Sequence, residues 1–343
     1  MHKLVRLFAA AAILLCHFAT TAAAEAHVDV ALDIYAKPQQ LVDIGGRNLN
    51  LRCSGTGATT VLLEAGNNAD SMTWSKLQPL VAKFAHVCSY DRAGTGFSDG
   101  GPLPRNVDTH ADDLAALLHS AHIATPLVLV GHSYGTNIVR RFADKHPDQV
   151  AAIVLLDPPP QNVAEFAPDL QKADDEEQEQ ELAIIRKCAE GAEKGQLDAP
   201  PPELKPCLRG PNPEFSDALN AAQHASKIRP AFWQTIISIK QTNNALYKQP
   251  VSAQEKHGAI PLLVLQPDAP FGDMPAEMRK PLEAAREKTQ KAIVATSSKG
   301  KIIAVARSSH DVQIDRPDAV VAAIKEALAK GAPAPRKTAA ATK

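Results

Sequence analysis

The chain has 343 residues, of which 45% are hydrophobic and 22% are charged, and its formal net charge is −1. This balance is normal for a globular protein, and the length allows one large domain or two ordinary ones with a sizeable core. The near-neutral charge gives no electrostatic reason to expect a nucleic acid as partner.

The first 24 residues have the pattern of a secretory signal peptide. A positively charged start is followed by an apolar run from Leu7 to Leu15 and by small residues at 22–24. The run is too short to span a bilayer comfortably, and no later stretch is long enough. We therefore expect cleavage after residue 24 and a secreted or periplasmic protein. Loss of Lys3 and Arg6 would change the formal charge from −1 to −3.

Four cysteines remain after such a cleavage, namely Cys53, Cys88, Cys188 and Cys207. An even number of cysteines in an oxidising compartment predicts two disulfides. The chain has no closely spaced Cys-x-x-Cys pair, so we expect no metal site. No motif indicates a cofactor.

Strands and helices alternate through residues 38–160, which we assign to the first part of a core domain. Gly45 and Gly46 separate the first two expected strands and indicate an antiparallel hairpin. The later alternation of strand and helix is typical of a parallel sheet covered on both faces. The expected strands are 41–44, 49–53, 60–66, 86–91, 127–130 and 151–156, and the expected helices are 74–84, 108–121 and 137–145.

The character of the sequence changes after Pro158, and we assign residues 161–257 to an insertion. It contains an acidic run at 174–177, which we expect on a solvated helix face, and many prolines. Cys188 and Cys207 both lie in this segment, and a bridge between them would stabilise a region with little core of its own.

The core resumes over residues 258–330, with strands expected at 260–265 and 301–306. A closing helix at 315–329 should be capped by Asp315 and carry Pro317 in its first turn. The Ala/Pro/Lys-rich tail at 331–343 is expected to be disordered.

The stretch from Gly131 to Gly135 reads Gly-His-Ser-Tyr-Gly and joins an apolar strand directly to a helix. A serine on such a turn projects its oxygen above the strand end, where the N–H groups of the next helix point. Ser133 is therefore the candidate nucleophile, and the N–H of Tyr134 is a candidate oxyanion donor. His310 follows the last expected strand and is the candidate base, while His132 is expected to point away from the site.

These features resemble the α/β-hydrolase superfamily, over roughly residues 39–330. The resemblance rests on the Gly131–Gly135 turn, on Tyr90–Ser98 (YDRAGTGFS) and on Ser308–Asp311 (SSHD). It implies a mostly parallel eight-stranded sheet flanked by helices, with the insertion forming a helical cap over the active site. In the superfamily's sheet order the strands that carry Cys53 and Cys88 are neighbours, so the resemblance also implies a disulfide between them, and leaves Cys188–Cys207 as the second.

The resemblance places the serine, the acid and the histidine in that order along the chain. Two carboxylates fit the acid that orients His310. Asp157 ends the strand that comes after the helix following Ser133. Asp268 follows the next core strand, after which many family members carry the acid, but it lies closer to the strand end than their acid usually does. We favour Asp157 and keep Asp268 as the alternative. Family members also take a second oxyanion donor from the loop after Gly66, here the N–H of Asn67, although Glu64 and Ala65 stand where many members have a His-Gly pair.

The predicted function is hydrolysis of a carboxylic ester of small or medium size through an acyl-enzyme. A secreted aminopeptidase or amidase of the same fold is the alternative. A non-catalytic binding protein on a hydrolase scaffold is the alternative of another class. Dehalogenase and epoxide hydrolase activities are disfavoured, since those relatives carry an aspartate in place of Ser133. The sequence gives neither the substrate's identity nor the oligomeric state.

Overall fold

A computed structural model describes residues 29–272 and 274–331 of the chain. The predicted signal peptide, residues 1–24, lies outside the described residues. The predicted disordered tail also lies outside them, except for Gly331, which ends the last helix. Within the described ranges, no helix combines the length and apolar character needed to cross a membrane.

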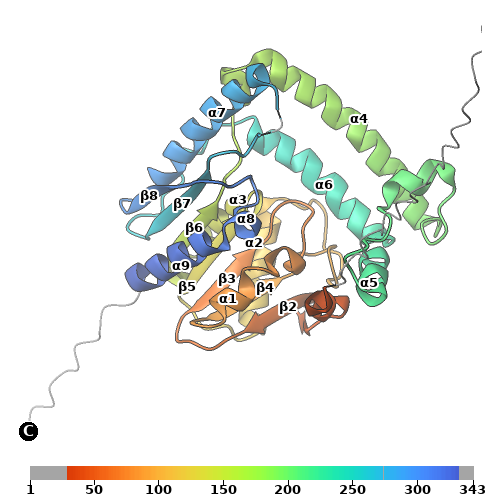
Figure 1. Ribbon diagram of the computed structural model, residues 1–343, viewed down its shortest axis with the longest axis horizontal. Helices are drawn as coiled ribbons and strands as arrows, with labels where there is room; N and C mark the ends of the chain where they lie inside the picture. The colour runs from red at the N-terminus through yellow and green to blue at the C-terminus, as the bar shows by residue number, and fades with distance from the viewer. Residues whose placement is uncertain (1–28, 273, 332–343) are drawn as a thin grey trace, which may run out of the picture.

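An eight-stranded sheet forms the centre of the molecule (Figure 1). Its strand order is β1-β2-β4-β3-β5-β6-β7-β8, antiparallel from β1 to β4 and parallel from there to β8. This confirms the predicted sheet and the antiparallel hairpin that opens it. The strands are β1 (Gln40–Asp43), β2 (Asn48–Ser54), β3 (Thr60–Glu64), β4 (His86–Tyr90), β5 (Leu127–His132), β6 (Val150–Leu156), β7 (Leu262–Pro267) and β8 (Gly300–Val305).

Helices cover both faces of the sheet, so every residue of β3, β5 and β6 is buried. This explains why these strands are nearly continuous apolar runs. One hydrophobic core lies between the sheet and α2 (Val107–Ser120), α3 (Gly135–Lys145) and α7 (Ala276–Val294). The other lies against α1 (Gln78–Val81), α8 (Val312–Asp315) and α9 (Pro317–Gly331).

Two local predictions about helices are wrong. The helix expected at 74–84 is divided into a 3₁₀ turn, η2 (Ser71–Trp74), and the short α1, because Pro79 has no N–H to donate to the carbonyl four residues before it. Asp315 does not cap the closing helix. It ends α8, and its carboxylate accepts hydrogen bonds from the N–H (2.8 Å) and the hydroxyl (2.6 Å) of Ser309.

The segment between β6 and β7 is mostly helical. Its two longest helices, α4 (Pro168–Glu193) and α6 (Pro230–Tyr247), run beside each other, and α4 lies farther from the sheet than α6 (Figure 1). A small hydrophobic core of its own joins these helices, and the Cys188–Cys207 disulfide ties α4 to a 3₁₀ turn, η5. The acidic run at 174–177 lies in α4 and is largely exposed. The elements are η3 (Pro147–Gln149) before β6, then η4 (Val163–Glu165), α4 (Pro168–Glu193), η5 (Pro202–Cys207), α5 (Asp217–Lys227) and α6 (Pro230–Tyr247).

The first described segment, η1 (Val30–Ala36), packs against α5 of this helical region. The Ser216 hydroxyl donates a hydrogen bond of 2.5 Å to the Asp33 carboxylate, and the N–H of Asp29 donates to the carbonyl of Glu214 at 3.0 Å. The amino-terminal segment is therefore attached to the inserted helices as well as to the sheet. No pattern in the sequence indicated this contact.

Candidate active site

Ser133 occupies a sharp turn between β5 and α3. Its backbone φ is +50°, a left-handed conformation that is uncommon for a residue with a side chain and costs energy. A Cβ at Gly131 would lie 2.7 Å from the carbonyl oxygen of Gly135, and a Cβ at Gly135 would lie 2.5 Å from the carbonyl oxygen of Ala65. Both glycines are thus required for the close backbone packing that exposes Ser133 at the edge of the sheet.

Asp157 immediately follows β6 and lies at the same edge. The N–H of Ser133 donates a 3.0 Å hydrogen bond to the carbonyl of Leu156, the residue before Asp157. The Asp157 side chain is only 2% exposed, and its Oδ2 lies 2.7 Å from Nδ1 of His310. The structure therefore brings the favoured acid and the candidate base into direct contact.

The other oxygen of Asp157 has two further partners, both from α7. Arg286 donates from Nη1 to Oδ1 at 2.6 Å, and Gln290 donates from Nε2 at 3.0 Å. Arg286 also donates from Nη2 to the carbonyl of Pro267 at 3.0 Å. Neither residue was predicted from the sequence. Their spacing of four on one helix, which places them on one face, is the only signal that could have indicated them.

Asp268, the alternative acid, makes different contacts. Its carboxylate accepts hydrogen bonds from the backbone N–H groups of Arg307 (2.9 Å) and Ser308 (3.1 Å), and these bonds lower the pKa of Asp268. It therefore ties the end of β7 to the loop that carries His310, and the described contacts do not join it to the imidazole.

His310 lies in this loop, between β8 and α8, with its side chain 39% exposed. The expectation that His132 points away from it is wrong. The two imidazole rings lie 4.8 Å apart, and Nε2 of His132 is 3.1 Å from the backbone oxygen of His310. Burial, and then the charge of His310, lower the pKa of His132 to about 4, so that at neutral pH its Nε2–H can donate to this oxygen without adding a charge.

Arg92 fixes the loop that was predicted to supply the second oxyanion donor. Its guanidinium is buried, forms a 2.6 Å ion pair with Glu64, and donates to the carbonyl oxygens of Ala65 (2.7 Å) and Gly66. Arg92 thus holds the backbone immediately before Asn67, whose N–H is the predicted donor. Tyr134, which carries the other predicted donor, is the N-cap residue of α3, where backbone N–H groups lack partners inside the helix.

The loop after β3 also borders a cavity of ≈ 270 Å³ between the sheet and the inserted helices. Asn68 and Thr95 line it from the core, and Lys227 and Phe232 line it from α5 and α6. Asp70 lines the same cavity, and burial raises the pKa of its carboxyl group. The cavity volume lies just below the range of about 300–1,000 Å³ that is usual for ligand pockets, and Ser133, Asp157 and His310 are not among the residues that line it.

Comparison with known proteins agrees with this architecture. A family model described as the alpha/beta hydrolase fold matches residues 59–184. An uncharacterized protein, YqjL, of Bacillus subtilis (strain 168) is 34% identical over 112 residues, which cover 33% of this chain and 44% of that protein. Lipase LipV of Mycobacterium tuberculosis is 35% identical over 103 residues, or 30% of this chain and 38% of the lipase. The chain thus spans less than half the length of these curated relatives.

A thermophilic esterase from Thermogutta terrifontis has a similar fold over most of its length. The TM-score is 0.54 at 21% sequence identity, and the match covers 86% of this chain and 99% of the esterase. At this identity the likeness concerns the fold alone. Together with the sheet order and the family-model match, it shows that the chain has the α/β-hydrolase fold.

Proposed function

We propose that the chain is a serine hydrolase that cleaves a carboxylic ester of small or medium size through an acyl-enzyme. The observation that carries this proposal is the 2.7 Å contact between Asp157 Oδ2 and His310 Nδ1, made at the edge of the sheet that also carries Ser133. A serine hydroxyl is a weak nucleophile near neutral pH and needs such an oriented base.

In the proposed reaction, Asp157 accepts the Nδ1–H of His310, so that Nε2 carries the lone pair. Nε2 takes the proton of Ser133 as its oxygen attacks the ester carbonyl, and returns it to the departing alcohol. The N–H groups of Tyr134 and Asn67 would stabilise the oxyanion. A water molecule activated by His310 then attacks the acyl-enzyme, releases the acid and restores Ser133.

The partners of Asp157 give α7 a positioning role in this proposal. Because Arg286 and Gln290 both donate to Oδ1, the carboxylate cannot rotate without losing them, and Oδ2 stays directed at His310. A buried carboxylate with three donors is well compensated for its lost hydration.

The cavity between the loop after β3 and the inserted helices is the proposed substrate subsite. Asn68, which lines it, directly follows the predicted oxyanion donor Asn67. At ≈ 270 Å³, just below the usual volume of a ligand pocket, the cavity favours a small substrate group.

The proposed setting is an oxidising compartment. The two disulfides, Cys53–Cys88 and Cys188–Cys207, support it, since such bonds persist mainly in secreted and periplasmic proteins.

An aminopeptidase or amidase is the second candidate. It would use the same Ser133, His310 and Asp157, with protonation of an amine leaving group in place of an alcohol.

Steady-state turnover of p-nitrophenyl esters of increasing acyl length, beside aminoacyl anilides, tests the proposal. We expect short acyl esters to give the highest kcat/KM, with a pre-steady-state burst where deacylation is slow. Faster turnover of the anilides would favour the aminopeptidase. Absence of turnover of every ester and anilide by the folded protein would contradict both and favour the non-catalytic binding protein.

A further inference from the structure

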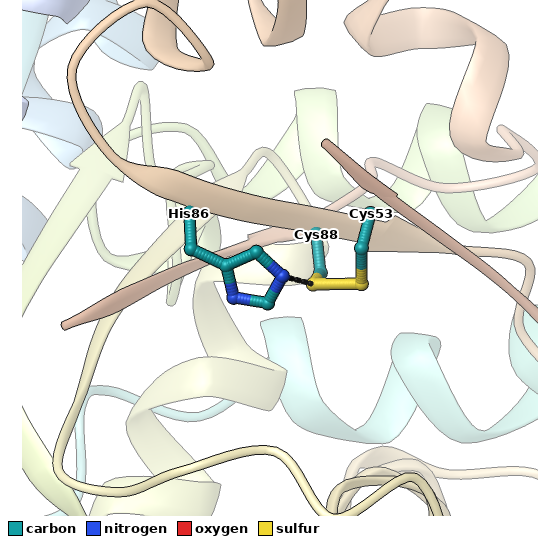
Figure 2. Close-up of side chains that lie close together, drawn as sticks. All are labelled: Cys53, His86 and Cys88. Atoms are coloured by element: carbon teal, nitrogen blue, oxygen red, sulfur yellow. Dashed lines mark hydrogen bonds between the residues drawn. A yellow bond between two sulfur atoms is a disulfide. The ribbon is translucent and has the colours of Figure 1, made fainter. Parts of the chain in front are cut away.

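The Cys53–Cys88 disulfide has a histidine beside it. Cys53 in β2 and Cys88 in β4 are direct partners across the antiparallel pair. His86 precedes Cys88 by two residues on the same strand, so both side chains lie on one face of the sheet. Figure 2 shows the imidazole turned toward the sulfurs, and Nε2 of His86 lies 3.8 Å from Sγ of Cys88.

The other ring nitrogen of His86 is held by the neighbouring strand. Nδ1 lies 3.0 Å from the hydroxyl of Thr60, which is the register partner of His86 in β3. When Nδ1 carries the proton and donates it to this hydroxyl, Nε2 presents its lone pair toward Cys88. This is the arrangement found in metal-binding histidines, whose second nitrogen donates to an orienting partner.

The ligand atoms of the two cysteines and of His86 all lie within 4.8 Å of one another. Zinc binds thiolate at about 2.3 Å and imidazole at about 2.0 Å in a tetrahedron, so bound sulfur and nitrogen atoms lie about 3.6 Å apart. The 3.8 Å between Sγ of Cys88 and Nε2 of His86 is already close to this value. The sequence spacing could not reveal the set, because only the pairing of β2 with β4 brings Cys53 to the other two residues.

The disulfide can be reached from solvent through Cys53. Cys88 is fully buried, whereas Cys53 is partly exposed and lines a surface cavity of ≈ 790 Å³ together with Gln39 and Gln78. A small dithiol can therefore attack the sulfur of Cys53 and release Cys88 as the leaving thiolate beside His86.

We propose that reduction of the Cys53–Cys88 disulfide converts this part of the sheet into a zinc site formed by Cys53, Cys88 and His86, with a fourth position open to water. The dithiol reductant gives two electrons to the disulfide and becomes a cyclic disulfide, and the protein gains two thiols. Binding of Zn²⁺ then releases two protons as both thiols become thiolates. The metal takes over the connection between β2 and β4 that reduction removes.

This site is separate from the candidate active site. His86 is the first residue of β4, at the end of the strand opposite to the edge where Ser133, Asp157 and His310 meet. The proposal therefore does not depend on the proposed hydrolase activity, and its test needs no substrate.

Titration of the full chain with Zn²⁺ against a chromophoric chelator, before and after reduction by a dithiol, tests the site. We expect one equivalent of zinc per chain after reduction, none in the oxidised protein, and no binding in the Cys53→Ser/Cys88→Ser variant. The Cys188→Ser/Cys207→Ser variant should still bind one equivalent, which separates this site from the other cysteine pair. Zinc should also raise the Tm of the reduced protein but not that of the oxidised protein.

Two substitutions test the histidine's part without touching the cysteines. His86→Ala should weaken zinc binding by at least tenfold, and Thr60→Val, which keeps the side-chain shape, by about tenfold. His119→Ala changes an exposed histidine on α2 and should have no effect. A reduced wild type that takes up no zinc while its circular dichroism stays native, or equal affinity in wild type and His86→Ala, would overturn the proposal.

Discussion

The contacts of Asp157 predict the effect of replacing it with asparagine in unusual detail. Oδ1 accepts from two donors, Arg286 and Gln290, and Oδ2 accepts from His310. In Asp157→Asn the amide oxygen must take the place of Oδ1, because an NH₂ group there would face the donors of Arg286 and Gln290. The NH₂ group then faces Nδ1 of His310 and donates to it.

This donation reverses the tautomer of His310. Its proton moves from Nδ1 to Nε2, which can then no longer accept the proton of Ser133. In a well-studied serine protease the equivalent loss of the correct tautomer lowers kcat about 10⁴-fold, or about 5.5 kcal/mol of transition-state stabilisation. We expect a loss of the same order here, with KM little changed, because Asp157 is buried and contacts no substrate in the proposed mechanism.

The assay is steady-state hydrolysis of a short-chain p-nitrophenyl ester, with the fold of each variant checked by circular dichroism. Asp268→Asn is the matched control, since Asp268 accepts only backbone N–H bonds within the loop, and its kcat should fall less than about tenfold. If Asp157→Asn kept more than a tenth of the wild-type kcat, or if Asp268→Asn lost more than Asp157→Asn, the assignment of the acid would be wrong.

Three further predictions concern the surroundings of the site. Arg286→Met leaves a buried carboxylate without its cation, so we expect kcat to fall about 10- to 100-fold. The unfolding free energy, measured in urea, should fall by about 3 kcal/mol. Values equal to those of the wild type would contradict this, and Arg279→Met, which changes a partly exposed side chain on α7, is the control. The folded state keeps His132 neutral down to about pH 4, whereas the unfolded chain protonates it below about 6.5, so stability should decrease as pH falls between these values by up to about 1.4 kcal/mol per unit. His132→Phe should show a shallower decrease in urea titrations over this range, and an unchanged slope would refute the reasoning. The Cys188–Cys207 bridge spans 19 residues, and its removal by Cys188→Ala/Cys207→Ala should lower the unfolding free energy by about 3 kcal/mol in the same titrations. An unfolding free energy equal to that of the wild type would argue against a stabilising role.

Features that depend on neighbouring residues were predicted well from the sequence. The turn at Ser133 needs glycines on both sides and an apolar strand before it, and all of these residues are contiguous in the sequence. The buried strands were evident for the same reason, since two covered faces require continuous apolar runs. The bridge between Cys53 and Cys88 needed one further step, the sheet order implied by the family resemblance.

Features that depend on packing between distant elements could not be predicted. Arg286 and Gln290 lie on a helix of mixed polar character, and nothing local distinguishes them from a solvated face. They become partners of Asp157 only because α7 packs beside the ends of β6 and β7. His132 was misjudged because the direction of its side chain depends on the loop after β8, more than 170 residues away along the chain. The short α1 shows that a proline outweighed an otherwise helical pattern of apolar residues.

Covalent trapping tests the central claim most directly, namely that Ser133, activated by His310 and Asp157, is the nucleophile. The purified chain should react with a fluorophosphonate probe to give a single adduct, located by peptide mass spectrometry on Ser133. Labelling should be absent in Ser133→Ala and strongly slowed in His310→Ala. A folded wild-type protein that stays unlabelled, or an adduct on a different residue that persists in Ser133→Ala, would contradict the account.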